Sequence, residues 1–587
     1  MDKERIITLA NQYVKFEKDP AFREEVEKLL AEQKYDELNE RFYKELDFGT
    51  GGIRGILGGG YNRLNTFIIR KTTQGLANYI RDRDAAAGAS NNTSNSSVVI
   101  AYDSRNYSSV FALETALVLC ANNIKTYLFT SLRPTPTLSF AVRHLGCTAG
   151  VVITASHNPA EYNGYKLAWS DGGQVVPPHD ELIIEEVRKS QPGDIKSMDE
   201  KTAIEKKLLI YIDEQVDKPY LEMVKNCFLR PTLVKEKGNT LKVVYTPLNG
   251  AGKIFIEKAL KEAGIEVITV PEQAEPDGNF PTLKFPNPEE ASAMELAINL
   301  AKKNKADIVM GTDPDSDRIG IAVPDADGKE YVLISGNQLG SMLVYYMLTT
   351  LNEHKKLPQN GATIKTIVTT ELQRLIGESF GVKVYDVLTG FKWIASLIAN
   401  FEKTGENYIF GTEESYGFLV NQEVRDKDAV SAAIVTAEMA LYCRAKGMSL
   451  LDYLNSIYEK YGYFKDTQIS GVFKGQKGVE TMKTLMSNLR VKPFEKLGEL
   501  KISAVRDYEK NISLNGITLP QSDVLQFILE DGSMVTVRPS GTEPKIKFYI
   551  SCRDAAGKKL QETKSIVDKK VDLITQDIKF VLDSQHL

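Results

Sequence analysis

The chain has 587 residues, of which 42% are hydrophobic and 26% charged, and its formal net charge at pH 7 is −5. At about 150 residues per domain, this length predicts roughly four domains, and the slightly acidic balance provides no overall basic field for binding nucleic acid. The five cysteines are odd in number and form no CxxC pair, which argues against a disulfide framework and a cysteine zinc site and indicates a reducing, cytoplasmic compartment. Residues 1–20 lack the apolar core of a signal peptide, and no stretch is apolar enough to span a membrane, so we expect no membrane partner.

The N-terminal part of the chain contains three kinds of segment. Residues 1 to about 45 are rich in Glu, Lys and Leu, with apolar residues at helical spacing, and predict surface helices. Residues 48–60 (FGTGGIRGILGGG) are too rich in glycine to form the interior of a regular element. The polar run 88–97 predicts a loop that leads into a buried strand at 98–102.

Beyond this region, short apolar strands alternate with stretches of helical length. Examples are VVITAS (151–156), LKVVYTPLNGAG (241–252) before a helix near Lys253, ADIVMGTDPDSD (306–317), IKTIVTTELQRLIGES (364–379) and ENYIFGTEES (406–415). Strand, loop and helix in succession predict parallel α/β units, whose ligands bind at the carboxyl ends of the strands. The distinctive polar residues all fall at such ends.

The C-terminal part has a different pattern. It predicts a hairpin around Asp531-Gly532, then a loop, a third strand and a long charged helix from about Lys558. This is the pattern of a separate α+β domain. We therefore place domain boundaries near residues 212, 330 and 475.

An acidic cluster follows one predicted strand in GTDPDSDRIG. Asp313, Asp315 and Asp317 would repel one another unless a hard divalent cation lay between them. An EF-hand loop would need glycine and glutamate where Arg318 and Pro324 stand, so Mg²⁺ fits better than an EF-hand calcium. Arg318 could then hold a phosphate group. The alternative is a solvated acidic turn.

The stretch TASHNPAEYNGYK (154–166) raises the question of a reactive serine. Ser156 lacks the GxSxG elbow of hydrolases, and His157 is too close in sequence to act readily as its triad base. A serine that is itself phosphorylated is the more economical interpretation, with its oxygen on the Mg²⁺. Lys166 would carry a proton if crowded cations lower its pKa. The alternative is a Ser/Asn turn closed by Pro159.

Three further stretches supply groups for a phosphorylated sugar. In VTVRPSGTEPKIKFY, one guanidinium, two hydroxyls and a flexible backbone could cradle a phosphate, although a plain β-turn is also possible. In GTEESYG, a carboxylate and a hydroxyl could bind sugar hydroxyls or could cap a helix, and LTGFKWI offers a lysine on a glycine turn. Together these stretches indicate a ligand with a phosphate, several hydroxyls and a metal-assisted transfer. The residues concerned are Arg538, Ser540, Gly541, Thr542, Glu413, Ser415, Gly390 and Lys392.

The motifs TASHNP, DPDSDR, GTEESYG and RPSGTEP, in this order, resemble those of the α-D-phosphohexomutases. The resemblance runs from FGTGGIRG to KIKFY, and the N-terminal helical segment and FPTLKFPNPEE resemble the phosphoglucomutase-2 and phosphopentomutase type. It implies three related α/β domains and a C-terminal α+β domain around a central cleft. On our boundaries these are residues 1–212 with the phosphoserine loop, 213–330 with the metal loop, 331–475 with the sugar-binding loop and 476–587 with the phosphate-binding loop.

The resemblance also implies a role for each motif residue. Ser156 would be the phosphoserine and a metal ligand beside the three aspartates, and Lys166 the general acid/base. The other catalytic residues would be His157 and Arg318. Substrate would be bound by Arg54, Gly390, Lys392, Glu413, Ser415, Lys427, Arg538, Ser540, Gly541, Thr542 and Lys547. Two positions depart from the pattern: relatives often have arginine at Lys547 and glycine at Ala429, which weakens the phosphate contact of the first and the role of Lys427 near the second.

The function implied is a phosphoglucomutase that interconverts glucose 1-phosphate and glucose 6-phosphate. A phosphoserine would donate its phosphoryl group, and the sugar 1,6-bisphosphate intermediate would turn around in the cleft and return the other phosphate. The aromatic residue of EESYG favours glucose over dual glucose and mannose use. Phosphomannomutase, phosphopentomutase, sugar-bisphosphate synthase, Mg²⁺-dependent phosphatase and a non-catalytic phosphosugar-binding protein are the alternatives. We expect a monomer or a weak homo-oligomer.

Overall fold

The computed structural model describes residues 2–46, 49, 52–86, 88, 96–473, 475–540 and 545–584. The chain divides into two compact units. The first contains residues 1–333, 395–403 and 417–441, and the second contains residues 334–394, 404–416 and 442–587. Within the described ranges, no helix is both long enough and apolar enough to cross a membrane.

The first unit begins with the predicted N-terminal helices, which are confirmed as α1 (Lys3–Phe16), α2 (Pro20–Ala31) and α3 (Tyr35–Phe42). Their apolar stripes are buried: the ring of Tyr13 packs edge-on against Phe42 and Phe67 at centroid distances of 5.8 and 6.0 Å. The buried carboxylate of Glu17 accepts hydrogen bonds from the Tyr13 hydroxyl and from the Phe67 N–H. These contacts attach the helices to the first domain.

The first sheet has the strand order β1-β5-β4-β2-β3-β6. Four of its strands are parallel, whereas β5 is antiparallel to β4, and β1 to β5. The strands are β1 (Gly52–Ile56), β2 (Ser97–Tyr102), β3 (Lys125–Phe129), β4 (Ala149–Ile153), β5 (Tyr162–Trp169) and β6 (Leu209–Ile212). The helices are α4 (Thr66–Ala86), α5 (Ser108–Ala121), α6 (Thr135–His144), α7 (His179–Lys189) and α8 (Glu200–Glu205).

The glycine-rich segment contains strand β1, so the expectation of irregular structure there was wrong. Glycine is required rather than merely tolerated, because a Cβ at Gly52 would lie 2.0 Å from the carbonyl oxygen of Tyr165. As an edge strand, β1 pairs Gly52 with Lys166 and Arg54 with Gly164. A segment with little side-chain bulk therefore brings Arg54 beside β5.

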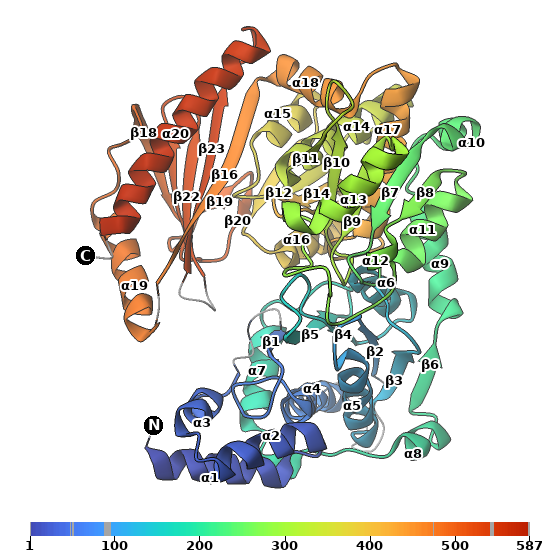
Figure 1. Cartoon of the computed structure of the whole chain (residues 1–587), viewed down its shortest axis with the longest axis vertical. Coiled ribbons are helices and arrows are strands. Elements are labelled where there is room, and N and C mark those ends of the chain that lie inside the picture. The colour runs from blue at the N-terminus through green and yellow to red at the C-terminus, as the bar shows by residue number, and fades with distance from the viewer. Residues whose placement is uncertain are drawn as a thin grey trace. The chain divides into compact units, whose positions relative to one another are not determined.

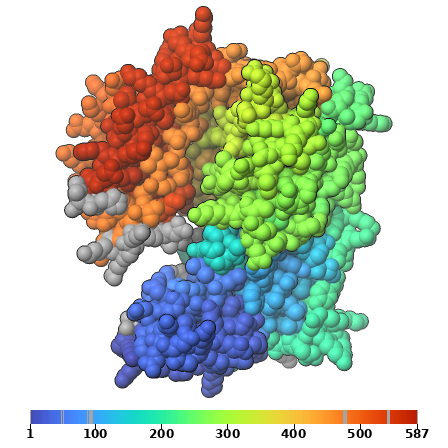
Figure 2. All heavy atoms as spheres, in the orientation of Figure 1, coloured from blue at the N-terminus to red at the C-terminus, as the bar shows by residue number. Residues whose placement is uncertain are grey.

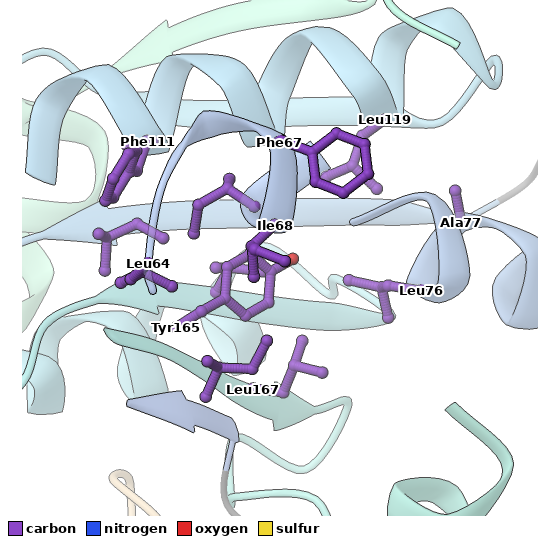
Figure 3. Packing of buried hydrophobic residues seen from close by; sticks show 14 of the residues in the cluster. Leu64, Phe67, Ile68, Leu76, Ala77, Phe111, Leu119, Tyr165 and Leu167 are labelled. Atoms are coloured by element: carbon purple, nitrogen blue, oxygen red, sulfur yellow. The ribbon is translucent and has the colours of Figure 1, made fainter. Parts of the chain in front are cut away.

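The core of the first domain orients β5. Phe67, Ile68 and Leu76 of α4 belong to the buried cluster that contains Tyr165 and Leu167 of β5 (Figure 3). Because side chains alternate along a strand, burying both of these residues under α4 directs the intervening residue 166 to the opposite face of the sheet. The packing of the core thus sets the direction of the predicted acid/base lysine.

The second sheet, in the order β11-β10-β9-β7-β8, also belongs mostly to the first unit. It consists of β7 (Lys242–Thr246), β8 (Glu266–Thr269), β9 (Ile308–Thr312), β10 (Ile319–Pro324) and β11 (Tyr331–Ile334). Helix α11 begins at Lys253, as predicted. The helices are α9 (Glu214–Lys225), α10 (Pro231–Lys237), α11 (Lys253–Glu262), α12 (Pro271–Ala274) and α13 (Ala291–Asn304).

The predicted succession of strand, loop and helix was wrong at the serine and acidic loops. The serine loop joins β4 to β5, and the acidic loop joins β9 to β10, and both pairs of strands are antiparallel. Each loop therefore turns the chain back onto the same sheet. The expectation that both loops lie at the carboxyl end of a buried strand is confirmed.

The second unit contains a parallel arrangement of β13 (Lys383–Val387), β12 (Gly361–Thr366) and β14 (Asn407–Glu413). Helices α14 (Gly336–Glu353), α15 (Leu372–Ser379) and α18 (Leu450–Tyr461) belong to this part. Three elements include residues of the first unit, namely α16 (Phe391–Thr404), β15 (Gly417–Leu419) and α17 (Ala429–Ala445).

The C-terminal domain confirms the predicted hairpin, third strand and long helix. Its sheet has the order β16-β23-β22-β21-β18-β17, and helix α20 (Leu560–Ser584) lies across it (Figure 1). Figure 2 shows α20, in red, exposed along one face of this part of the chain. The other elements are β16 (Tyr463–Val472), α19 (Gly475–Val491), β17 (Lys496–Leu497), β18 (Leu500–Asp507), β19 (Ser513–Leu514), β20 (Ile517–Thr518), β21 (Leu525–Leu529), β22 (Met534–Pro539) and β23 (Lys545–Asp554).

Candidate active site

The serine loop holds Ser156 in an unusual backbone conformation. Its φ is +54°, in the left-handed region that non-glycine residues rarely adopt, and its N–H donates to the Thr154 hydroxyl at 2.8 Å. The Ser156 hydroxyl is buried and donates to Asp313 Oδ2 at 2.9 Å. Strained backbone of this kind is concentrated at functional sites, and here it directs the hydroxyl into the acidic cluster.

His157 contacts the oxygen of the adjacent serine, which we judged too close in sequence for it to act readily on as a triad base. Its Nδ1 is 3.1 Å from Ser156 Oγ. Burial, followed by the positive charges of Arg318 and Arg54, holds the pKa of His157 well below its ordinary value of 6.5. The imidazole is therefore neutral at physiological pH and can exchange a hydrogen bond with the serine without adding charge to the site.

The three aspartates of the acidic loop form one compact, buried cluster. One carboxylate oxygen from each lies within 4.8 Å of the others, and each residue is at most 1% exposed. Burial, and then the charges of Asp315 and Asp317, raise the pKa of Asp313 well above its ordinary value. Its Oδ1 accepts the N–H groups of Asp317 at 3.1 Å and Arg318 at 3.0 Å, which closes the loop around the carboxylate.

The donor set of this cluster fits a hard divalent cation. Among the described atoms, Asp315 Oδ1 and Asp317 Oδ1 are buried and accept no hydrogen bond. Orphaned buried carboxylate oxygens are costly, and an oxygen-coordinated metal ion such as Mg²⁺ would satisfy them. The groups that would hold it are the three carboxylates and the nearby Ser156 hydroxyl.

Two lysines balance the charge of the cluster. Lys166 Nζ donates to Asp315 Oδ2 at 2.7 Å and lies 3.4 Å from Asp317 Oδ2, and Lys427 Nζ lies 3.2 Å from the same Asp317 oxygen. Burial lowers the pKa of Lys166, but the two carboxylates outweigh burial and raise it above its ordinary value. The lowered pKa that we expected for Lys166 was therefore wrong.

Two arginines border the serine and the acidic cluster. Arg54 of β1 donates from Nη1 to Asn158 Oδ1 at 2.9 Å, in the serine loop itself. The Arg318 Nε lies 3.8 Å from Asp317 Oδ1, and the charges of both arginines act on His157. Ser156, His157, Lys166, Arg54, Arg318, Lys427 and the three aspartates are thus brought together in the first unit.

The predicted sugar-binding residues belong to the second unit. Glu413, at the end of β14, is 6% exposed and accepts the N–H of Gly390 at 2.8 Å, so two separate predicted stretches meet. Gly390 has a φ of +118°, which a side chain would disfavour. The ammonium of Lys392 lies 4.9 Å from the Trp393 ring centroid. Ser415 follows two residues after Glu413, on the loop that leads to β15.

The predicted phosphate-binding loop begins at the end of β22. Arg538 and Lys547 are cross-strand partners on β22 and β23, so two cations stand side by side at the start of the loop. The Ser540 N–H donates to the carbonyl of Lys545 at 2.7 Å. Gly541 and Thr542 lie outside the described residues.

The pKa of Glu414, in the predicted sugar-binding loop, leads to a prediction of how the free energy of unfolding depends on pH. Burial, and then the charge of Glu413, raise the pKa of Glu414 to about 7. Between the unfolded value near 4.5 and about 7, the unfolded chain binds fewer protons than the folded protein, so stability falls as pH rises. We expect the unfolding free energy of Glu414→Gln, relative to the unmodified protein, to increase by about 1–2 kcal/mol between pH 5 and 8.

Urea unfolding at both pH values measures this difference. The matched control is Glu459→Gln, which changes an exposed glutamate of α18. It measures the effect of the same exchange away from the buried Glu413 and Glu414 pair. A difference for Glu414→Gln that does not change between pH 5 and 8 would contradict the raised pKa.

Two residues that support the site, Thr135 and Arg105, were not predicted from the sequence. Thr135, at the start of α6, donates its hydroxyl to Asp315 Oδ2 at 2.8 Å and its N–H to the Asp315 carbonyl at 2.8 Å. Arg105, which follows β2, donates hydrogen bonds to main-chain carbonyls of the serine loop. The position of Arg105 just beyond the carboxyl end of a buried strand was a usable signal, whereas nothing near Thr135 indicated its partner.

Comparison with known families gives a consistent result over the length of the chain. Family models for phosphoglucomutase/phosphomannomutase match in order: α/β/α domain I at residues 45–193, domain II at 218–328, domain III at 335–461 and the C-terminal domain at 486–565. A phosphoglucomutase from Staphylococcus haemolyticus is 36% identical over 520 residues, covering 87% of this chain and 91% of the relative. A Homo sapiens phosphopentomutase is 32% identical over 590 residues, covering 96% and 94%.

Solved structures resemble the fold at lower sequence identity. The open form of Paramecium pp63/parafusin, a phosphoglucomutase, aligns with a TM-score of 0.67 at 16% identity, covering 91% of this chain and 96% of that one. A phosphoglucomutase/phosphomannomutase family protein from Burkholderia thailandensis aligns with a TM-score of 0.64 at 17% identity, covering 92% and 97%. At these identities the similarity supports the fold alone.

Proposed function

Because the chain belongs to the phosphoglucomutase/phosphomannomutase family and is therefore a sugar-phosphate mutase of the isomerase class, we propose that it interconverts glucose 1-phosphate and glucose 6-phosphate through a phosphorylated Ser156. One observation carries the proposal: the Ser156 hydroxyl lies 2.9 Å from Asp313, inside a buried acidic cluster that a lysine also reaches. An oxygen that could carry a phosphoryl group, carboxylates that could hold a cation and a lysine that could carry a proton thus lie close together in the first unit.

In the proposed mechanism, phosphoserine 156 gives up its phosphoryl group to a free hydroxyl of the sugar. The sugar oxygen forms a bond to phosphorus as the bond between phosphorus and the serine oxygen breaks. A Mg²⁺ on Asp315 and Asp317 would offset the carboxylate charge that raises the pKa of Lys166, and burial would then lower this pKa, so that Lys166 can accept the hydroxyl proton as the proposed general base. In the return step the serine oxygen takes the other phosphate of the bisphosphorylated sugar, and the lysine returns the proton to the freed sugar oxygen.

The charges around the serine suit this transfer. Phosphoryl transfer depends mainly on positioning and on stabilisation of charge at the transferring group. A Mg²⁺ held by Asp313, Asp315 and Asp317 would supply positive charge to phosphoryl oxygens. Arg318 would add a guanidinium suited to the same oxygens, and neutral His157 would hydrogen-bond the serine oxygen.

The predicted substrate-binding residues complete the proposal. We propose that Glu413 and Ser415 bind sugar hydroxyls, with Gly390 orienting Glu413, and that Arg54, Lys392 and Lys427 contact anionic groups. Arg538, Ser540, Gly541, Thr542 and Lys547 would bind the phosphate that does not react. The pairing of Arg538 with Lys547 supports this role, because two adjacent cations suit a dianionic phosphate. The 1,6-bisphosphate would serve as activator and intermediate.

The domain boundaries near 212, 330 and 475 also stand as our proposal. They are supported by the four family matches, none of which crosses one of these positions. A cytoplasmic location stays a prediction from the cysteine usage, the charged N-terminal residues and the lack of a long apolar stretch in the sequence.

Phosphorus NMR on the purified protein, with Mg²⁺ and a trace of glucose 1,6-bisphosphate, tests the proposed substrate. Glucose 1-phosphate, mannose 1-phosphate and ribose 1-phosphate are supplied separately, and Ser156→Ala serves as the inactive control. Fastest conversion of glucose 1-phosphate supports the proposal. Fastest conversion of ribose 1-phosphate would make the protein a phosphopentomutase, the activity named for the human relative. No conversion of any sugar would overturn the catalytic proposal.

A further inference from the structure

Arg105 binds the main chain of the serine loop at several points. Its Nη1 donates to the carbonyl oxygens of Pro159 at 2.8 Å and Tyr162 at 2.9 Å. Its Nη2 donates to the carbonyl of Ser156 at 2.6 Å and also to that of Asn158. One guanidinium therefore donates hydrogen bonds to four main-chain carbonyls within a span of seven residues.

The guanidinium is itself held in place. Arg105 is 3% exposed, and its Nε lies 3.5 Å from Asp103 Oδ2. The buried Asp103 carboxylate also accepts the Arg105 N–H at 2.9 Å, the Ser108 hydroxyl at 2.7 Å and the Thr154 hydroxyl at 2.6 Å. On another side, the guanidinium lies 5.1 Å from the ring centroid of Phe280. The arginine is thus anchored between β2 and the loop around residue 280.

This arrangement matters because the Ser156 backbone is strained. A left-handed φ at a non-glycine residue persists only where the surroundings hold it. The Ser156 carbonyl is one of the four that Arg105 binds, and the others fix the following turn. Since both terminal nitrogens of the guanidinium are occupied by carbonyls, Arg105 is arranged to bind the loop rather than a phosphate.

We propose that Arg105 is a positioning residue for the phosphoryl transfer: it holds residues 156–162 so that the Ser156 oxygen points at the acidic cluster. The inference rests on the proposed role of Ser156 as the phosphoryl carrier. A lysine at this position would keep the charge but lacks the planar fork that reaches several carbonyls at once. The effect of substitution should therefore fall on the reaction rate more than on substrate binding.

The test compares Arg105→Lys and Arg105→Ala with the control Arg70→Lys in the full chain. Arg70 is also a buried arginine of the first domain and pairs with Glu114 at 2.5 Å, away from the serine loop. For Arg105→Lys we expect kcat to fall about 10²-fold with KM within about threefold, because small misplacement of a reacting group is costly. Phosphorylation of Ser156 by glucose 1,6-bisphosphate, followed by intact mass, should slow by a similar factor.

Chemical rescue separates positioning from general destabilisation. Added guanidinium ion should restore part of kcat in Arg105→Ala and should leave Arg70→Lys unchanged. The proposal is overturned if Arg105→Lys loses no more kcat than Arg70→Lys, or if its loss appears only in KM. These outcomes differ from failure of the proposed function itself. In that case the unmodified protein would neither accept a phosphoryl group at Ser156 nor convert any sugar phosphate.

Discussion

Replacing Ser156 by alanine is expected to lower kcat by about 10⁴-fold or more, because removal of a covalent nucleophile leaves no acceptor for the phosphoryl group. The substitution removes one buried hydroxyl and its bond to Asp313, so the fold should be retained. Steady-state assays with glucose 1-phosphate measure the loss. Intact mass after incubation with glucose 1,6-bisphosphate should show one added phosphoryl group in the unmodified protein and none in the variant.

The matched control is Ser190→Ala. Ser190 is also a buried serine of the first domain, and its hydroxyl donates only to the main-chain carbonyl of Glu186 at 2.8 Å among the bonds described. It should keep full activity and accept the phosphoryl group normally. Phosphorylation of the Ser156→Ala protein at another residue, with activity retained, would show that the carrier has been assigned to the wrong side chain.

Removal of the metal site is expected to have the second large effect. Burial and the charges of Asp315 and Asp317 raise the pKa of Asp313, so replacing its carboxylate by a neutral asparagine removes repulsion that offsets the loss of a hydrogen-bond acceptor. We therefore expect Asp313→Asn to change the unfolding free energy in chelator by no more than about 1 kcal/mol. The unmodified protein should gain about 2–3 kcal/mol when Mg²⁺ is present at roughly 100 times its dissociation constant, and the variant should lose most of this gain.

Thermal unfolding with chelator and with added Mg²⁺ measures both quantities, and kcat should fall at least about 10²-fold in the variant. Asp307→Asn is the control, since it changes an aspartate of the same domain whose side chain accepts the Lys242 N–H. It should retain the stabilisation by Mg²⁺. An equal Mg²⁺ response in Asp313→Asn and the unmodified protein would place the cation elsewhere.

Local sequence features were sufficient to predict where the site groups lie along the chain. Ser156 and Asp313 follow short, buried apolar strands, and Glu413 is the last residue of another strand. Side chains in these positions lie at the carboxyl ends of the strands. The C-terminal hairpin was predictable for a similar reason, since the Asp531-Gly532 turn and the alternating strands are neighbours in sequence. The helix expected after the serine loop was wrong because strand direction depends on pairing with β4, which the local pattern does not encode.

The sequence by itself determined the residue types of the site, their strand ends and, through four ordered motifs, the family. Only the tertiary structure decided which loops meet. Ser156 and Asp313 are 157 positions apart, and Thr135 and Asp315 are 180 apart. Periodicity reports which face of an element is buried, but not which element covers it. The contacts of Arg105 and the direction of Lys166 depend on packing between segments distant in sequence, so they became visible only in the folded chain.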